Sequence, residues 1–401
     1  MNAVGIDISK GKSTVAVMRP FGEIVISPFE ISHTDSELKQ LVKTLKGLHG
    51  ETRVVMEYTG CYHTPVAQVL YESGFYVSVV NAMLIHSYGN NSLRRTKTDR
   101  KDAVKLANYA LEHWLTLPQY QPMEDIRLML KTYYHQYGQV AKMRTMQKNN
   151  LIALLDISYP NANRLFTSAS RADGSEKWVD FVMHFWHYRC VSELSANAFT
   201  DRYKRWCKRH GYHFSMSKAR SIHNMARSCV GIIPKTDATR ILIQQAAAQL
   251  LSSSATLAVL QTQMQHLAET LPEYPIVMKM YGVGPILGPQ LMAEIGDVRR
   301  FYSKKALVAF AGIDAPPYQS GQMEVRSRNI SKRGSPALRR TLFLVMSVFL
   351  QHSPIDEPIY QFMDKKRAES KPYRVYMMAS ANKFLRIYYA TVKQYLDRLE
   401  A

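Results

Sequence analysis

The sequence predicts an α/β domain at the N-terminus followed by a mainly helical remainder, so the fold class is α/β plus α. Runs rich in β-branched residues alternate with helical patterns over the first part of the chain. The segment 124–157 then contains no proline and many helix-forming residues. Further on, apolar residues recur at every seventh position between Thr236 and Leu271.

The N-terminal elements are expected in the order of three strands, helix, strand, helix, strand, helix. The strands are expected at residues 3–9, 13–18, 23–31, 53–57 and 75–80. The helices begin near Asp35, Thr64 and Thr98, where residues suited to a helix N-terminus stand. Three consecutive strands predict a meander, and the later alternation predicts parallel crossovers. This mixture is the strand order of the ribonuclease-H-like fold.

With 401 residues, the chain has room for two or three domains of about 150 residues each. We expect an α/β domain at 1–120, a helical and coiled-coil region at 121–271 that contains a basic insert at 160–235, and a C-terminal domain at 272–401. The heptad positions that predict the coiled coil are Ile243, Leu250, Leu257, Met264 and Leu271, with Ala246, Ser253, Leu260 and Leu267 at the companion positions. The partner helix lies either within the chain or in a second chain.

The charge of the chain predicts a polyanionic partner. Lys and Arg total 52 against 32 Asp and Glu, which gives a net charge of +20. Basic side chains that neutralise phosphates release condensed counterions, so such an excess favours nucleic acid. A basic protein that only adheres to nucleic acid is the alternative. Because no signal peptide and no apolar run of ~18 residues is found, we expect a cytoplasmic, nucleoid-associated protein.

The insert contains an uninterrupted basic stretch. Between Arg202 and Lys235 there are nine Lys or Arg and no Asp or Glu. Aromatic residues are interleaved with these cations at Tyr203, Trp206, Tyr212 and Phe214. One interpretation is that Arg205, Lys208 and Arg209 follow phosphates while the rings stack on unpaired bases. The other is a solvated basic face around an ordinary aromatic core.

A second pattern in the insert suggests a metal ion. His187 and Cys190 have the same spacing as Cys207 and His210, and on two antiparallel helices these four side chains would form a tetrahedral zinc site. Buried cysteines and surface histidines on ordinary helix faces are the alternative interpretation.

Four carboxylates in the N-terminal part are predicted to converge. Asp7 lies inside an apolar strand, Glu57 ends the fourth strand, and Asp99 and Asp102 share one face at the start of a helix. In a ribonuclease-H-like sheet the first and fourth strands are neighbours and the last helix packs beside them. Mg²⁺ would then relieve the repulsion between the carboxylates. The cations just before the helix, expected to hold the scissile strand, are Arg94, Arg95 and Lys97. Asp99 and Asp102 alone could simply favour the helix N-terminus.

Two features of the C-terminal part are candidates for contact with nucleic acid. The turn Gly282-Val283-Gly284 resembles the hairpin of a helix-hairpin-helix unit, or else it is a plain turn between helices. Ser320 lies in a loop that two prolines and Gly321 make irregular, and it is expected to be exposed. An activated serine can form a covalent phosphodiester with DNA, although Ser-Gly is usually only a turn. The cations expected to bind phosphates near this loop are Arg326, Arg328, Lys332, Arg333, Arg339 and Arg340.

These motifs together resemble one family, the insertion-sequence transposases with a DEDD RuvC-like domain, which are related to the Piv/MooV pilin-gene invertases. The motifs are Gly5-Ile6-Asp7, Met56-Glu57-Tyr58-Thr59-Gly60, Thr98-Asp99-Arg100-Lys101-Asp102-Ala103 and Tyr318-Gln319-Ser320-Gly321. The resemblance covers residues 1–155 and 275–385. The chain departs from the family at Tyr58, where a small residue is common, and in the longer segment 160–235.

The resemblance implies that Asp7, Glu57, Asp99 and Asp102 bind Mg²⁺ or Mn²⁺, and that Ser320 of a C-terminal serine domain is a nucleophile that links to DNA. It also implies a structured bridge RNA encoded by the element, whose loops pair with target and donor DNA. Two dimers would form a tetramer in which different subunits contribute the two domains of each active site.

Two other functions compete with an RNA-guided recombinase. A metal-dependent nuclease or junction resolvase would hydrolyse DNA with an activated water, and Ser320 would then only position phosphate. A non-catalytic RNA-binding assembly protein would not need the four carboxylates.

Overall fold

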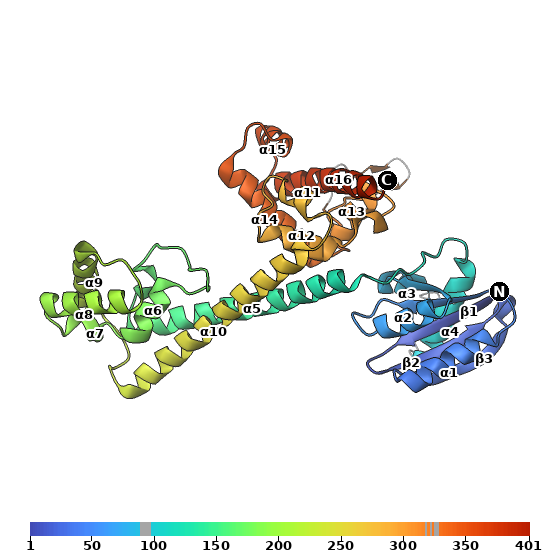
Figure 1. Cartoon of the computed structure of the whole chain (residues 1–401), viewed down its shortest axis with the longest axis horizontal. Helices are drawn as coiled ribbons and strands as arrows, with labels where there is room; N and C mark the ends of the chain where they lie inside the picture. Colours follow the sequence, from blue (N-terminus) through green and yellow to red (C-terminus); the bar gives the residue numbers. More distant parts are fainter. Residues whose placement is uncertain (89–97, 317–318, 321–322, 325–328) are drawn as a thin grey trace. The chain divides into compact units, whose positions relative to one another are not determined.

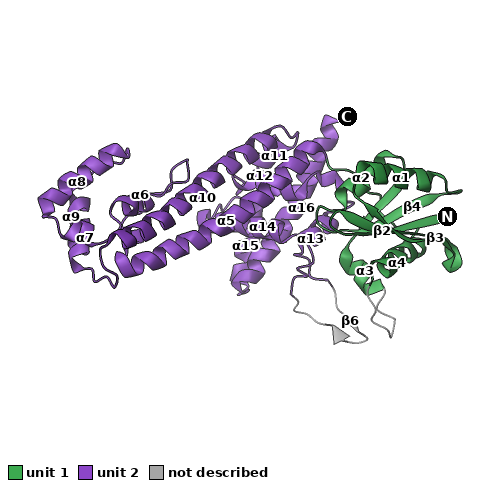
Figure 2. Cartoon of the chain, turned by 90° about the horizontal axis from the view of Figure 1, so that it is seen from below, with its two compact units in different colours: residues 1–123 green, residues 124–401 purple. Residues whose placement is uncertain are grey.

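The computed structural model describes residues 1–88, 98–316, 319–320, 323–324 and 329–401. It divides into two compact units, residues 1–123 and 124–401, coloured separately in Figure 2. Unit 1 is built on a sheet of five strands, and unit 2 is helical apart from a two-stranded ladder. The predicted α/β part and helical part are therefore both confirmed.

The sheet of unit 1 has the strand order β3-β2-β1-β4-β5. The bounds are Asn2–Ile8 for β1, Lys12–Met18 for β2, Ile24–Ser32 for β3, Thr52–Glu57 for β4 and Tyr76–Val80 for β5. The first three strands form an antiparallel meander, whereas β4 runs parallel to β1 and β5 runs parallel to β4. All five strands and the neighbouring positions of the first and fourth were predicted from the sequence.

Helices cover both faces of this sheet, as Figure 2 shows. Helices α1 (Asp35–Lys46) and α2 (Thr64–Glu72) bury leucine, valine and alanine side chains against Val4, Ile6 and Ile8 of β1. On the other face, α4 (Asp99–Glu112) packs on Ala3 and Val55, and the short α3 (Ala82–Tyr88) packs beside it. Alternate residues of β1 therefore face the two different helical layers.

Unit 2 is organised along one antiparallel pair of long helices, α5 (Asp125–Ser158) and α10 (Asp237–Glu269), visible in Figure 1. Leu155 near the end of α5 shares a core with Ile243 near the start of α10, while Leu130 shares a second core with Met264. The heptad repeat thus packs mainly within the chain. Ser253 and Ser254 occupy the middle of the pair, and the Nε of Arg144 donates to the Ser254 Oγ at 2.8 Å.

Each core of unit 2 is completed by shorter helices. The core near residues 151–250 contains α6 (Lys177–His184), α7 (Arg189–Ser192), α8 (Ala196–Arg209) and α9 (Met216–Ser228). The other core contains α11 (Tyr274–Met278), α12 (Leu287–Ile295), α13 (Lys304–Ala311), α14 (Pro336–His352), α15 (Pro358–Ala368) and α16 (Tyr373–Leu399). Three short 3₁₀ turns lie at Pro20–Gly22, Ala162–Arg164 and Val298–Arg300. None of the helices in the described ranges combines the length and apolar character needed to span a membrane.

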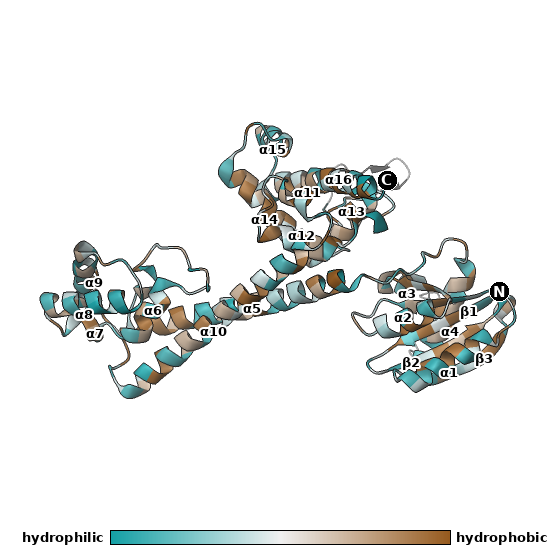
Figure 3. Cartoon of the chain, in the orientation of Figure 1, coloured by the Kyte–Doolittle hydropathy of each residue, from teal (hydrophilic) through white to brown (hydrophobic). Residues whose placement is uncertain are grey.

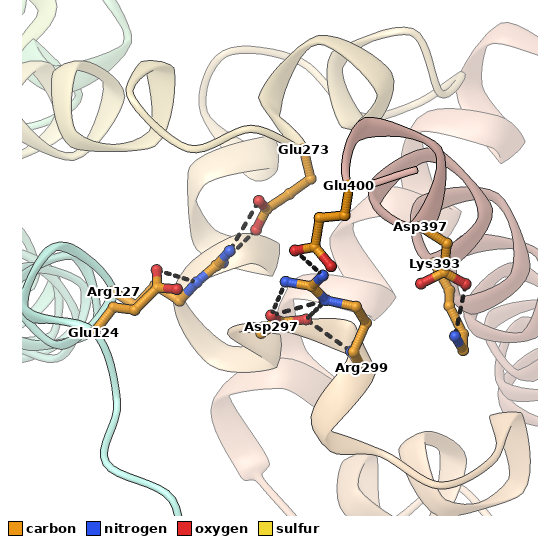
Figure 4. Close-up of polar contacts among 8 residues, drawn as sticks. All are labelled: Glu124, Arg127, Glu273, Asp297, Arg299, Lys393, Asp397 and Glu400. Carbon is orange, nitrogen blue, oxygen red and sulfur yellow. Dashed lines mark hydrogen bonds and ion pairs between the residues drawn. The ribbon is translucent and has the colours of Figure 1, made fainter.

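A buried ion pair joins the start of α5 to the segment before α11 (Figure 4). The Arg127 guanidinium is 4% exposed and forms two hydrogen bonds with the Glu273 carboxylate, which is 1% exposed. The Nε of Arg127 also donates to Glu124 at 3.0 Å. Nearby, Arg299 bonds to Asp297 and to Glu400 beyond the end of α16. These bonds hold the beginning of the long helix to the C-terminal core.

Candidate active site

The ends of β1 and β4 bring two of the predicted carboxylates together. Ile6 is paired with Met56 in the parallel register, so the next residues, Asp7 and Glu57, end these neighbouring strands side by side. Asp7 alternates with Ala3 and Gly5, which lie on the face covered by α4. Glu57 alternates with Val55 on that same face. Both carboxylates are half-buried.

The packing of α4 on β1 is unusually close and requires glycine at position 5. A Cβ atom at Gly5 would lie 2.0 Å from the Ala103 carbonyl oxygen and 2.4 Å from the Ala107 nitrogen. Such distances are impossible for backbone atoms, so any side chain there would push the helix off the sheet. The glycine of the Gly-Ile-Asp motif therefore fixes the separation between α4 and β1.

The direction of α4 places its first turn next to Asp7. The Arg53 side chain at the start of β4 bonds to the carbonyl of Trp114, just after the helix, whereas Gly5 in mid-strand contacts Ala103. The helix therefore runs antiparallel to β1. Two residues of strand span about 6.6 Å, and four residues of helix span about 6 Å. Moving from Gly5 to Asp7 along β1 thus corresponds to moving from Ala103 to the first turn of α4.

The first turn of α4 carries the other two predicted carboxylates. Asp99 is exposed and Asp102 is half-buried, and the Thr98 hydroxyl caps the helix by accepting the Lys101 N–H at 3.3 Å. Thr98 was predicted as the N-cap. The backbone therefore gathers the four carboxylates at one end of the sheet. In the side-chain positions of the structure, however, no three His, Cys, Asp or Glu of the described residues stand close enough to hold one metal ion.

The chemistry of the donors suits a divalent cation of the Mg²⁺ class. All four groups are carboxylates, which supply hard oxygen ligands. Direct binding of one ion by three of them requires their side chains to rotate inward, because the structure does not hold them at ligating distance. Tyr58, the departure from the family motif, is exposed beside this end of the sheet and its ring packs 4.8 Å from that of His63.

The Ser320 loop of unit 2 is anchored by two glycines at its base. A Cβ at Gly334 would lie 2.0 Å from the Phe310 carbonyl oxygen, and Gly312 ends α13 with φ of 65°. Ser331 donates its backbone N–H to the Asp314 carbonyl at 2.8 Å, and its hydroxyl bonds to the Asp314 carboxylate. The two ends of the loop are thus held tightly together, a feature that sequence analysis did not foresee.

Within the loop, the backbone of Ser320 belongs to a short antiparallel ladder. The strand β6 (Gln319–Ser320) pairs with β7 (Met323–Glu324), and Ser320 lies opposite Met323. The predicted exposure of the Ser320 side chain concerns a position whose side chain lies outside what the structure describes. The same holds for Arg326, Arg328, Arg94, Arg95 and Lys97, which fall among the residues not described.

A buried carboxylate beside the loop base was missed by sequence analysis. Glu294 of α12 is 4% exposed, and it accepts a hydrogen bond from the Ser335 hydroxyl at 2.6 Å and bonds to His135 at 2.8 Å. Burial alone would raise the pKa of the Glu294 carboxyl, but the bonds to His135 and Ser335 and the nearby Lys131 lower it overall. A lone glutamate in an apolar helix was the available signal. Ser335 also caps α14, so Glu294 helps to fix the end of the loop.

The described basic residues near the loop differ in how far their charges are committed. Lys332, Arg333 and Arg340 are exposed. Arg339 is half-buried and donates to the Ala311 carbonyl at 3.0 Å, so it braces the loop base. In the insert, Arg205, Lys208 and Arg209 lie exposed on α8, which is coloured mostly hydrophilic in Figure 3.

The aromatic residues of the insert form a core rather than a stacking surface. Tyr203 is fully buried and Trp206 is 3% exposed, and their rings stack on one another at 5.6 Å. The prediction that these two rings meet unpaired bases is therefore wrong. Tyrosine and tryptophan have the same periodicity in a helix whether they face a core or a ligand, so the sequence alone did not separate the two interpretations.

The zinc site predicted in the insert is also wrong. Both ring nitrogens of His187 are engaged by backbone groups, the Ile233 carbonyl at 3.1 Å and the Arg189 N–H at 3.1 Å. Cys207 is fully buried in the aromatic core, and the His210 ring lies against Trp206. Among the described residues, which include all four predicted ligands, no group of three potential ligands gathers. Equal spacings in two helices do not ensure that the faces meet.

The turn Gly282-Val283-Gly284 lies between α11 and α12. Gly282 has φ of 75°, and a Cβ there would lie 3.0 Å from the Phe349 ring of α14. The turn borders a largely apolar cavity of about 410 Å³ that Val348 and His352 also line. Its glycine is required by this close packing, and the predicted phosphate contact stays a prediction.

Comparison with known proteins agrees with these observations. Residues 4–160 match a DEDD family model of the IS110 group described as "Transposase", and residues 274–361 match one described as "Transposase IS116/IS110/IS902 family". Together the two matches span more than half of the chain.

Full-length relatives have the same character. The pilin gene-inverting protein of Moraxella bovis is 23% identical over 348 residues, 85% of this chain and 80% of the relative. An uncharacterized protein of insertion element IS110 from Streptomyces coelicolor is 20% identical over 390 residues, 97% of this chain and 93% of the relative. The transposase for insertion sequence element IS1111A of Coxiella burnetii matches over a shorter stretch, 26% identical over 128 residues, 32% of this chain and 34% of the relative. With its carboxylate-bearing sheet and its two matched domains, the chain belongs to the IS110/IS116 family of transposases, and it is a DNA recombinase/transposase enzyme.

Proposed function

We propose that this transposase cuts and rejoins DNA through a covalent intermediate on Ser320, assisted by a divalent metal ion at Asp7, Glu57, Asp99 and Asp102. The observation that carries the proposal is the alignment of the first turn of α4 with the ends of β1 and β4. The strand order of the sheet supports a ribonuclease-H-like assignment for this domain. Because the chain is an enzyme, the non-catalytic assembly protein is set aside.

The carboxylate end of the sheet is proposed as the place where the phosphate is activated. Mg²⁺ or Mn²⁺ bound there would withdraw charge from a phosphoryl oxygen and orient the attacking and leaving groups. The protein's part is to bring the donors together: Gly5 permits the close approach of α4, and Thr98 fixes the start of the helix. The exposed position of Asp99 leaves this end of the sheet open to a DNA strand.

Ser320 is proposed as the nucleophile. Its Oγ would form a bond to phosphorus while a phosphorus–oxygen bond of the DNA backbone breaks, with the serine proton leaving and the departing sugar oxygen becoming a hydroxyl. The reverse step with another DNA hydroxyl releases the serine and rejoins the strand without an external energy source. The tight loop base at Gly312 and Gly334 supports this role, since a nucleophile must be held in a fixed geometry.

Guidance by an element-encoded RNA is part of the proposal. The resemblance implies such an RNA, and the net charge of +20 and the exposed cations of α8 are suited to a polyanion of this kind. The resemblance also implies that dimers assemble into a tetramer in which the carboxylates and Ser320 of one active site come from different chains. Both points are proposals about assembly that extend the transposase assignment.

The second candidate chemistry is hydrolysis by an activated water, as in a metal-dependent nuclease or junction resolvase. The cluster of carboxylates favours it as much as it favours transfer to serine. The two chemistries differ in one product, because only transfer to serine gives a covalent protein–DNA species.

The test is a trapping assay with the full-length protein, its element RNA, Mg²⁺ and labelled donor and target DNA. We expect an adduct that survives denaturation, is absent in Ser320→Ala, and persists in the control Ser252→Ala, which changes an exposed serine of α10. Cleaved DNA without an adduct, at a rate that Ser320→Ala leaves unchanged, would establish the hydrolytic reaction instead.

A further inference from the structure

The basic insert contains a polar cavity that none of the motifs accounts for. It has a volume of about 580 Å³ and lies between α6, α8 and the start of α9. Five hydroxyl groups line it: those of Thr167, Ser168, Ser215, Ser217 and Ser221. The volume lies in the range of cavities that bind small ligands or single nucleotides.

Two lysines converge on this cavity. The Nζ of Lys177 lies 4.8 Å from the centroid of the Phe166 ring, and the Nζ of Lys218 lies 5.5 Å from the same centroid. Arg171 adds a third cation close by, over the Tyr212 ring at 4.0 Å. Within the described ranges, neither lysine ammonium forms an ion pair with a carboxylate, and Asp180 is bonded to the Tyr212 hydroxyl.

Bringing these cations together has a cost that an anion would remove. Burial lowers the pKa of Lys177, the Cys207 thiol opposes this, and the charges of Lys218 and Arg171 lower it further. A cation over an aromatic ring is held electrostatically, and its N–H groups remain available to donate. An anionic ligand in the cavity would accept from both lysines and relieve their repulsion.

Two more donors face the same space. Helix α9 begins at the cavity with Ser215 as its N-cap, and the first turn of a helix presents backbone N–H groups that favour anions. Independently, the Tyr203 hydroxyl lines the cavity, is fully buried, and is hydrogen-bonded to no described nitrogen or oxygen. The weakly bonding Cys207 thiol lies beside it. A buried hydroxyl without a good partner is costly unless a ligand completes it.

We propose that this cavity binds a phosphate group of a nucleic-acid strand. Lys177, Lys218 and the first turn of α9 would hold the phosphate oxygens, while the serine and threonine hydroxyls bond to the adjoining sugar. The site is distinct from the exposed cations of α8 because it is enclosed and rich in hydroxyl groups. The inference does not require the serine or metal chemistry proposed above.

The test compares binding of a single-stranded RNA and a DNA of the same sequence to the full-length protein and its variants. We expect Lys177→Met/Lys218→Gln to weaken binding of a strand roughly tenfold, as expected for losing charge-assisted bonds to phosphate. The control Lys142→Gln/Lys204→Gln removes the same charge from exposed positions outside the cavity, and it should change affinity much less. Equal losses in the two double variants would overturn the proposal.

A second variant guards against misfolding of the first. Ser217→Asp places a negative charge at the mouth of the cavity, and because Ser217 is exposed in the first turn of α9 the change favours the helix. We expect it to weaken strand binding while the thermal unfolding curve is unchanged. Undiminished binding by Ser217→Asp would contradict a phosphate in the cavity.

Chemical labelling of lysines then distinguishes a strand from a free ion. We expect the RNA or DNA strand to protect Lys177 and Lys218 from acetylation, with inorganic phosphate as a weaker competitor. A strand that protects under both RNA and DNA conditions indicates recognition of the shared backbone, and protection by RNA alone assigns the hydroxyls to the ribose. Protection by inorganic phosphate with none by either strand would assign the cavity to a free phosphate and overturn the inference.

Discussion

Acidic residues occupy opposite environments in the two units. In unit 1, Asp7 and Glu57 end neighbouring strands beside the carboxylates of α4, so that several negative charges gather at one end of the sheet. In unit 2, Glu273 is 1% exposed and doubly bonded to Arg127, and Glu294 is bonded to His135 and Ser335. Buried carboxylates that are bonded to cationic or hydroxyl groups hold a fold together, whereas carboxylates that gather with one another are suited to binding a metal cation.

The largest expected effect comes from breaking the buried pair of unit 2. Arg127→Met leaves Glu273 charged, buried and without its partner, so we expect the free energy of unfolding to fall by about 3–5 kcal/mol. Chemical denaturation measures this. The double variant Arg127→Met/Glu273→Leu should recover most of the loss. If the double variant is as unstable as the single one, packing rather than the charge explains the effect.

The carboxylates of unit 1 should show the reverse behaviour. We expect Asp7→Asn to lower DNA strand transfer at least about a hundredfold, equivalent to about 3 kcal/mol. The free energy of unfolding should stay unchanged or rise, because one of the repelling charges is removed. Asp35→Asn makes the same chemical change at the exposed start of α1 and should leave transfer intact. Normal transfer by Asp7→Asn would remove the carboxylates from the mechanism.

This contrast explains why the sequence predicted one unit better than the other. The strands, the cap at Thr98 and the carboxylate positions follow from local rules of alternation and spacing, and Gly5 marks the helix contact. In the insert, Tyr203 and Trp206 lie between cations, and composition could not reveal that they face inward. His187 and Cys207 fail as ligands because tertiary contacts, which no spacing encodes, engage them otherwise.

The base of the Ser320 loop was missed for the same reason. Glu294 approaches His135 and Ser335, which lie far from it along the chain, so its partners depend on how α5, α12 and α14 pack. The close approach of Gly334 to Phe310 likewise depends on tertiary structure. A buried glutamate in an apolar helix predicts a partner but does not identify it.

A smaller effect is expected from pH at Glu294. Since its carboxyl has a lowered pKa in the folded state, its contribution to stability is present above the ordinary pKa of glutamate and is lost as the pH falls through the lowered value. We expect Glu294→Gln to cost about 1–3 kcal/mol at neutral pH, and the difference from the unmodified protein to close in acid. Denaturation curves across this range measure it, with the exposed Asp364→Asn as control. A difference independent of pH would show that ionised Glu294 does not stabilise the fold.

The smallest expected effect tests whether the exposed cations after the Ser320 loop contact DNA. Lys332 and Arg333 are exposed and sit next to the tight turn at Gly334, so their charges are free to follow a phosphate backbone. We expect Lys332→Gln/Arg333→Gln to weaken DNA binding by roughly tenfold and to lower the slope of log affinity against log salt by about one for each phosphate that is no longer neutralised. Lys371→Gln/Arg374→Gln, exposed in the same unit, removes equal charge at a distance along the chain. A reduced slope confined to the first variant places the DNA at the loop base, where Arg339 and Glu294 hold the backbone that carries Ser320. Equal slopes in both variants would mean that the cations act only through net charge.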